Sequence, residues 1–154
     1  MTAELMFEPQ VDTEPGVMKR VNERIARMLD TTLGSAMDVV SLTRQGIPAT
    51  AMDILEKEGF HKKDMEWIIN PRTLRDRKRK TRRLTREESD RWFRAAKVLA
   101  LAVEVFGDKS KAQNWLHRHR RGFGGEAPID LITTEAGTDI VEQALNAIDA
   151  GFFA

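Results

Sequence analysis

A dense run of Lys and Arg is the feature of this sequence with the clearest chemistry. Between residues 72 and 83 the chain carries eight basic residues and one acid. Like charges four residues apart repel one another on a helix, and contacts with nucleic-acid phosphates would relieve that repulsion. Arg near the start of a recognition helix can also reach guanine O6 and N7 in the major groove. The alternative interpretation is a solvated charged face with no partner.

The basic run divides into two predicted roles. The candidates to face the groove are Arg72, Thr73, Arg75 and Arg79. Four other basic residues are better placed for phosphates, and they are Lys78, Lys80, Arg82 and Arg83.

Other reactive side chains form no recognisable site. His117 and His119 flank Arg118 with no carboxylate or third His at ligand spacing, and cationic neighbours disfavour a bound cation. The glycines of residues 122–125 follow no strand and precede no Lys-Ser/Thr, so they form no Walker motif. The chain has no Cys, which removes thiol catalysis and thiolate metal sites. We therefore expect no catalytic residue, no metal and no cofactor.

The C-terminal segment has the opposite charge. From Glu126 to Ala154 there are six carboxylates and no Lys or Arg, although the net charge of the whole chain is only +1. A segment of this kind suits a partner with a cationic surface. Phe152 and Phe153 lie near the end of the chain, beyond Gly151. They either anchor in a partner or fold back on the helical core.

Length and composition indicate a soluble globular protein. The chain has 154 residues, 41% of them hydrophobic and 32% charged, enough for one domain or one domain with a small module. No apolar run approaches the roughly 18 residues of a membrane span, and no secretory signal is visible. We expect a cytoplasmic protein without a membrane partner.

The hydrophobic periodicity predicts an all-α fold of about eight helices and no strands. Residues 1–16 contain four acids and no bases, and we expect them to form a mobile acidic tail. The final helix should bury one face, formed by Ala136, Ile140, Val141, Ala144, Leu145 and Ile148. The expected helices cover residues 17–33, 35–45, 48–58, 62–68, 71–79, 86–106, 109–117 and 134–150, with one further turn in 128–133.

The helices predicted at 62–68 and 71–79 have the lengths and order of a helix-turn-helix. Asn70 can cap the second helix and Pro71 can occupy its first position. The turn of such a motif usually holds a Gly, whereas Ile68 or Ile69 occupies it here. A β-branched residue resists a positive φ, so we expect the turn to be built differently.

The region from Leu84 to Ala154 resembles the Xre/MbcA/ParS group of bacterial antitoxins. Any one matching motif would be weak, but together their order and spacing are specific. Residues 46–83 resemble the Xre-like domain of that family more loosely, and the first 45 residues carry no recognisable signal. The matching pieces are LTREESDRWFRAAKVLALAVEVFGD, KAQNWL, FGGEAPIDLITTEAG and AIDAGFFA.

The resemblance implies a non-enzymatic, helical antitoxin of a type II toxin–antitoxin module. Its partner would be a RES-domain toxin that consumes NAD, and its C-terminal domain would obstruct the toxin's active site. Its N-terminal domain would dimerise and bind operator DNA, so that the complex represses its own operon. On this basis residues 17–106 form an Xre-like helix-turn-helix domain and residues 107–154 a toxin-binding domain.

Transferred by position, the toxin-binding residues would be Gly124, Gly125, Pro128, Asp130, Leu131, Glu135, Gly137, Gly151, Phe152, Phe153 and Ala154. The chain departs from the family before the glycine pair, where residues 117–121 are rich in His and Arg. This change either alters the local toxin contacts or adds a second anion-binding spot. An alternative function is a helix-turn-helix transcriptional repressor whose C-terminal module dimerises or senses a ligand.

Overall fold

The computed structural model describes residues 16–151, and these residues form eight α-helices and two 3₁₀ turns. They include no strand, only one isolated bridge between Pro48 and Arg83, so the all-α prediction is confirmed. The acidic tail predicted for residues 1–16 lies outside the described residues, apart from Gly16. The elements are α1 (Val17–Met28), α2 (Ala36–Gln45), α3 (Ala51–Lys57), η1 (Lys62–Met65), α4 (Pro71–Arg79), α5 (Arg86–Phe106), α6 (Lys109–His117), η2 (Arg121–Phe123), α7 (Pro128–Leu131) and α8 (Glu135–Asp149).

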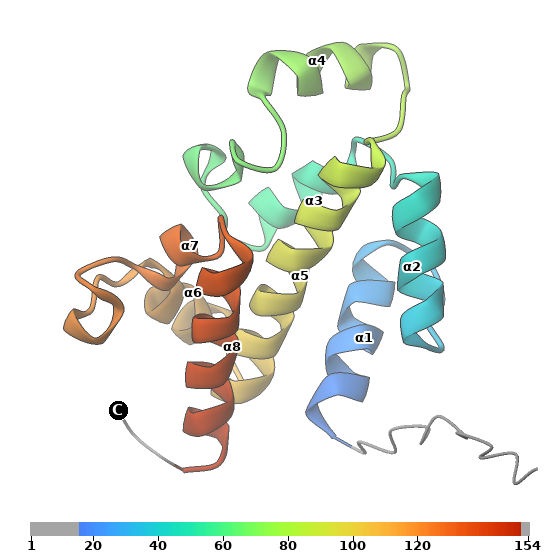
Figure 1. Cartoon of the computed structure of the whole chain (residues 1–154). Coiled ribbons are helices and arrows are strands. Elements are labelled where there is room, and N and C mark those ends of the chain that lie inside the picture. The colour runs from blue at the N-terminus through green and yellow to red at the C-terminus, as the bar shows by residue number, and fades with distance from the viewer. Residues whose placement is uncertain (1–15, 152–154) are drawn as a thin grey trace, which may run out of the picture.

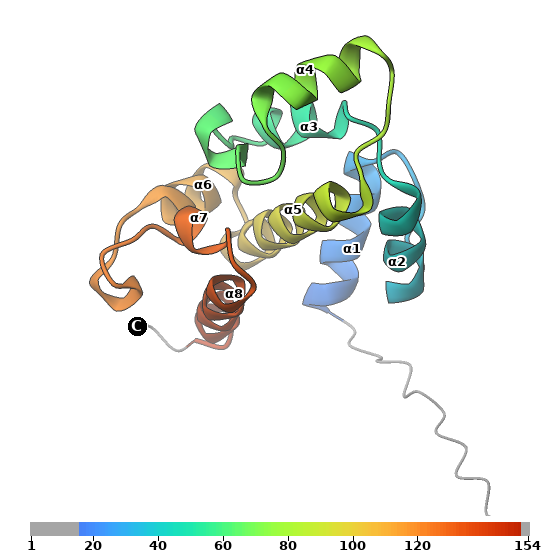
Figure 2. The same cartoon turned by 45° about the horizontal axis from the view of Figure 1, so that its top comes forward.

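The long helix α5 is the centre of the fold. It begins at a capping box, in which Thr85 Oγ1 accepts from the Glu88 N–H and Glu88 Oε1 accepts from the Thr85 N–H. It ends at Gly107, whose φ of 71° is readily adopted only without a β-carbon. Helices α1 and α2 pack on one side of α5, and α6 and α8 on the other (Figures 1 and 2). Most of its side chains are therefore buried.

Helix α1 is fastened to α5 by a paired ion contact as well as by apolar packing. Glu104 Oε2 accepts from Arg20 Nε at 2.9 Å, and Glu104 Oε1 accepts from Arg24 at 2.9 Å. Burial raises the pKa of Glu104, but the hydrogen bonds from Arg24 and Arg20 outweigh it, so the pKa lies below its ordinary 4.5. The charged carboxylate thus helps to hold α1 in place.

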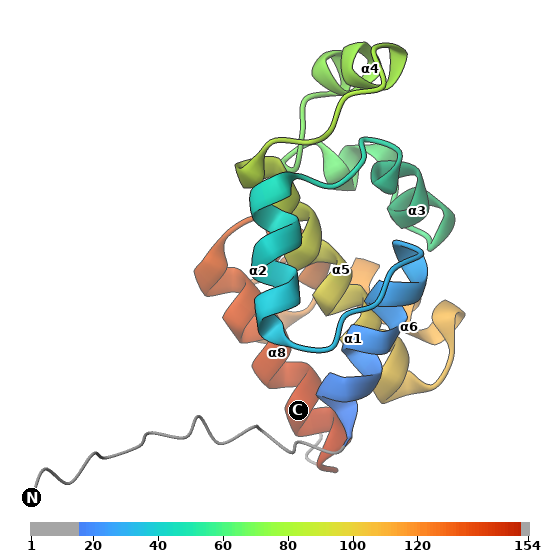
Figure 3. The ribbon, with the colours of Figure 1, turned by 90° about the vertical axis from the view of Figure 1, so that its right-hand side faces the viewer.

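Helix α4 lies apart from the other helices, at one end of the molecule beyond α3 (Figures 1 and 3). None of its side chains is buried. It is held by half-buried Leu74 and by two ion pairs, one joining Arg77 to Glu88 of α5 and the other joining Lys78 to Asp53 of α3. A groove of about 340 Å³ separates α4 from α3 and η1.

Two predicted helix boundaries are wrong. Helix α1 ends at Met28 rather than near Leu33, because Asp30 turns the chain with a φ of 50°. Helix α3 begins at Ala51 rather than at Pro48, which instead pairs with Arg83 in the isolated bridge.

The prediction of a first helix for the helix-turn-helix is also wrong. Only the 3₁₀ turn η1 forms within residues 62–68, followed by irregular turns. Trp67 Nε1 donates to the Asp64 carbonyl at 2.8 Å, which occupies an acceptor that a longer helix would need. Ile68 and Ile69 keep negative φ, so the expectation of an unusual turn is confirmed. The second helix, α4, forms as predicted, with Asn70 Oδ1 accepting from the Arg72 N–H at 2.9 Å.

Candidate functional site

The first candidate surface is one exposed side of α4, which we call the α4 face and which meets the groove toward α3 at Arg75. Arg72, Arg75 and Arg79 are exposed and follow one another at spacings of three and four residues, so they share one side of the helix. Arg72 and Arg75 form no ion pair with any described residue. Exposed guanidinium groups without internal partners are free to contact phosphates or base edges.

The remaining predicted DNA contacts are partly engaged within the chain. Lys78 pairs with Asp53, and both Arg79 and Lys80 pair with Asp76. Hydrogen bonds from Lys80 and then Arg79 lower the pKa of Asp76. In the linker that follows α4, Arg83 donates to the Gly46 carbonyl at 2.8 Å. Thr73 and Arg82 are exposed, without a side-chain hydrogen bond to any described residue.

The second candidate surface lies in α7, α8 and the loop before α7. Its exposed carboxylates form no ion pair with any described Lys or Arg, whereas half-buried Glu142 pairs with Lys97 of α5 at 3.3 Å. We call these exposed residues the acidic surface, and they are Glu126, Asp130, Glu135, Asp139 and Asp149. This part of the sequence contains no Lys or Arg, and in the fold its exposed carboxylates form a surface whose negative charge is not neutralised.

An apolar residue lies beside these carboxylates, and the prediction that it is buried is wrong. Ile140 is 48% exposed, and Ala136 of the same helix is also exposed. Val141 is fully buried. Adjacent helical residues point about 100° apart, and the core-facing side of α8 contains Val141 but not Ile140. The apolar spacing alone does not show which side of α8 packs on the core, and Ile140 is the candidate contact that the sequence analysis missed.

The predicted toxin-binding residues fall into three groups, which are accessible, buried, and outside the described residues. Gly124, Gly125, Asp130, Glu135 and Gly151 are exposed, and Leu131 is half-buried. Pro128 and Gly137 are buried. Phe152, Phe153 and Ala154 lie outside the described residues.

The two buried residues, Pro128 and Gly137, shape this region rather than present a surface. Pro128 occupies the first position of α7, where its missing N–H is harmless. A β-carbon on Gly137 would lie 1.9 Å from the Leu131 carbonyl oxygen, so only glycine lets α8 start this close to α7.

The loop rich in His and Arg packs on an aromatic cluster. The Arg120 guanidinium lies 5.4 Å from the centroid of the Trp115 ring, and Phe123 contacts the same ring edge-on at 6.0 Å. Burial and then the nearby charge of Arg118 lower the pKa of Arg120. Arg118 and Arg121 are exposed, so they are the basic residues of this loop that a partner can reach.

The two histidines of this loop have different partners. His119 Nδ1 lies 2.9 Å from the Gly125 carbonyl oxygen. His117 instead approaches Asp64 and His61, which are more than 50 residues earlier in the chain. Spacing along the chain does not predict this grouping, because its members are far apart in the sequence.

No helix in residues 16–151 is long and apolar enough to cross a membrane.

Comparisons with known proteins give these surfaces a context. Residues 101–151 match the family described as the antitoxin Xre/MbcA/ParS C-terminal toxin-binding domain. The match begins inside α5 and includes the whole acidic surface and Ile140. The domain boundary expected at residue 107 stays a prediction.

Relatives match over most of the chain. The antitoxin Xre of Pseudomonas putida is 35% identical over 131 residues, which cover 84% of this chain and 82% of that protein. The antitoxin Xre of Yersinia enterocolitica is 30% identical over 122 residues, covering 79% of this chain and 76% of that protein. Similarity at this level extends well beyond the C-terminal region. The chain therefore belongs to the Xre family of antitoxins, within the Xre/MbcA/ParS group.

Proposed function

We propose that this antitoxin neutralises a RES-domain, NAD-consuming toxin by blocking access to the toxin's active site. It acts in the cytoplasm, without catalysis of its own, as a homodimer within a larger toxin–antitoxin complex. Through α4 it also binds operator DNA and represses its own operon.

The observation that carries the toxin-binding role is the position of the acidic surface. It lies entirely within residues 101–151, the region that matches a toxin-binding domain. A site that binds the pyrophosphate of NAD must present cationic groups or helix N-termini. Unpaired carboxylates in the same region as an exposed apolar side chain complement such a site in charge and offer a contact that excludes water.

The toxin-binding role is tested by co-expressing the chain with the RES-domain protein encoded by the neighbouring gene. We expect the two proteins to co-purify and NAD consumption to stop. Replacing Glu135 and Asp139 with Lys should weaken the complex, because like charges then face each other. The loss of affinity should be largest at low salt, where this repulsion is screened least. The matched control replaces exposed Glu23 of α1 and Glu56 of α3 with Lys, which reverses the same charge outside the matched region. An equal loss of toxin affinity in both variants would show that the net charge of the antitoxin, and not the acidic surface, determines binding.

The DNA-binding role is supported by the α4 face. Arg72 and Arg75 present unpaired guanidinium groups on a helix that lies clear of the rest of the fold. Helix α4 is capped at its start by Asn70, so its N-terminal turn is rigid enough to present them. The predicted helix-turn-helix is incomplete, because η1 replaces its first helix, so the support comes from α4 itself.

This role is tested by a gel-shift titration with the promoter of the operon. Replacing Arg72 and Arg75 with Ala should weaken binding by at least about tenfold, and lower the salt slope by roughly two if both contact phosphates. The control replaces exposed Lys19 and Arg27 of α1 with Ala, which removes the same charge elsewhere. Unchanged binding at matched salt would exclude α4 as the recognition helix.

A further inference from the structure

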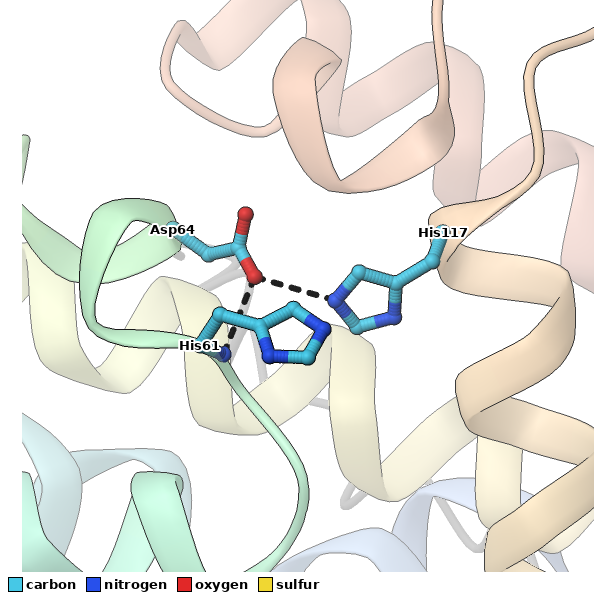
Figure 4. Close-up of side chains that lie close together, drawn as sticks. All are labelled: His61, Asp64 and His117. Carbon is cyan, nitrogen blue, oxygen red and sulfur yellow. Dashed lines mark hydrogen bonds and ion pairs between the residues drawn. The ribbon is translucent and has the colours of Figure 1, made fainter.

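Three side chains from separate parts of the chain meet between η1 and α6. His61 and Asp64 belong to the start of η1, and His117 is the last residue of α6 (Figure 4). One potential ligand atom from each residue lies within 4.8 Å of the other two. His117 Nε2 and Asp64 Oδ2 are already 3.0 Å apart.

The surroundings of His117 expose the lone pair of Nε2 toward Asp64. Its Nδ1 lies 2.9 Å from the carbonyl oxygen of Gln113, which can only accept, so Nδ1 carries the proton. In the neutral ring, Nε2 is then an acceptor that faces a carboxylate oxygen, a second acceptor. Two acceptors at this distance repel each other unless a proton or a metal ion lies between them. A carbonyl that fixes the far ring nitrogen is also the usual second partner of a metal-binding His.

Asp64 needs a positive partner within this cluster. Its side chain is only 5% exposed, and within residues 16–151 it pairs with no Lys or Arg. The backbone N–H of His61 donates to the same Oδ2 at 3.0 Å, which supplies one hydrogen bond but no charge. A buried carboxylate without a neutralising group is costly.

His61 completes the set of donors. Its ring lies edge-on to the His117 ring, with the centroids 4.7 Å apart (Figure 4). The residue is exposed and is the N-cap of η1. Rotation of this side chain can therefore bring a ring nitrogen toward the gap between Asp64 and His117 without disturbing the core.

We propose that His61, Asp64 and His117 bind one divalent transition-metal ion, with Zn²⁺ the best match to two imidazoles and a carboxylate. Zn²⁺ sits about 2.0–2.1 Å from each such ligand, which places tetrahedral ligand atoms roughly 3.3 Å apart. The His117–Asp64 distance is close to this value, His61 reaches it by rotation, and water takes the fourth position. Arg118 follows His117 but is exposed, so solvent screens its charge.

Binding would tie the segment that leads into α4 to the end of α6, within the toxin-binding region. This inference does not depend on the toxin or on DNA.

The test uses the full chain with any affinity tag removed, because the protein contains only three His residues. With Zn²⁺ alone we expect one ion per chain by elemental analysis, and a rise in Tm of roughly 5–10 °C when the free ion exceeds its Kd about 100-fold. His61→Ala should raise the Kd by at least about 100-fold and abolish the shift. His119→Ala is the matched control, since it removes the remaining histidine. It should change neither the Kd for Zn²⁺ nor the rise in Tm.

His61→Ala carries the test because an exposed side chain can be removed without unfolding the protein. Asp64→Asn is the second variant, which keeps the shape of the side chain and should also abolish the response. The proposal is overturned if Zn²⁺ leaves Tm unchanged, if His61→Ala binds as tightly as the unaltered chain, or if His119→Ala loses as much. In the first two cases a proton on His117 joins it to Asp64 as a simple ion pair.

Discussion

Replacing Ile140 with Ala should weaken toxin binding without weakening the fold. Complete burial of an Ile side chain contributes about 1.5–3 kcal/mol, and 48% of this residue remains exposed in the free chain. Covering that remainder in a complex is therefore worth about 1 kcal/mol, or roughly a fivefold change in Kd. Ala is the better helix former by a few tenths of a kcal/mol, which offsets part of the packing lost in the free protein. Tm should change little.

The matched control is Met37→Ala on α2. Met37 is 64% exposed and is, with Ile140, one of the two exposed large hydrophobic side chains in residues 16–151, but it lies outside the matched domain. Calorimetric titration of the antitoxin variants into the RES-domain toxin measures both Kd values. An unchanged Kd for Ile140→Ala, or an equal loss for Met37→Ala, would refute the argument that Ile140 is an interface anchor.

Three further changes test the fold and the acidic end of the chain. Gly137→Ala forces a β-carbon against a backbone oxygen and should lower the unfolding free energy by about 2–3 kcal/mol, whereas Gly122→Ala, which meets no atom, should leave Tm nearly unchanged in thermal melts. Glu104→Gln should cost about 1–2 kcal/mol at pH 7, because the pKa of Glu104 is lowered in the folded state. That stabilisation is present above pH 4.5 and is lost as the pH falls through the folded pKa, so urea melts of the two proteins should converge in acid. Deleting residues 151–154 should weaken neutralisation in a cell-growth assay with no loss of Tm, and full protection by the truncated chain would contradict a role for the tail.

The sequence predicts α5 almost to the residue because several local signals agree. Thr85 and Glu88 form the capping box, apolar residues recur at helical spacing, and Gly107 ends the helix in the left-handed region. The segment at 62–68 also has an apolar pattern of helical spacing, but one local contact and one tertiary contact oppose a longer helix. Trp67 bonds to a carbonyl of its own turn, and Arg91 Nε of α5 donates to the Ile68 carbonyl at 3.0 Å.

The candidate sites differ in how far the sequence could reveal them. Charge counting identified both the α4 face and the acidic surface, because each depends on residues close in sequence. To predict that Ile140 is exposed, one must know which side of α8 packs on the core, and the sequence pattern does not give this. The grouping of His61, Asp64 and His117 depends on how η1 and α6 pack, so no spacing within either segment predicts it.

The central proposal is that this antitoxin silences an NAD-consuming toxin by direct contact through residues 101–151, the region that matches a toxin-binding domain. The most direct measurement is NAD consumption by the purified RES-domain toxin of the same operon as the antitoxin is titrated in. We predict that consumption stops at a fixed molar ratio, and that Glu135→Lys with Asp139→Lys shifts the curve to higher antitoxin concentration. Undiminished NAD consumption at saturating, folded antitoxin would contradict the account.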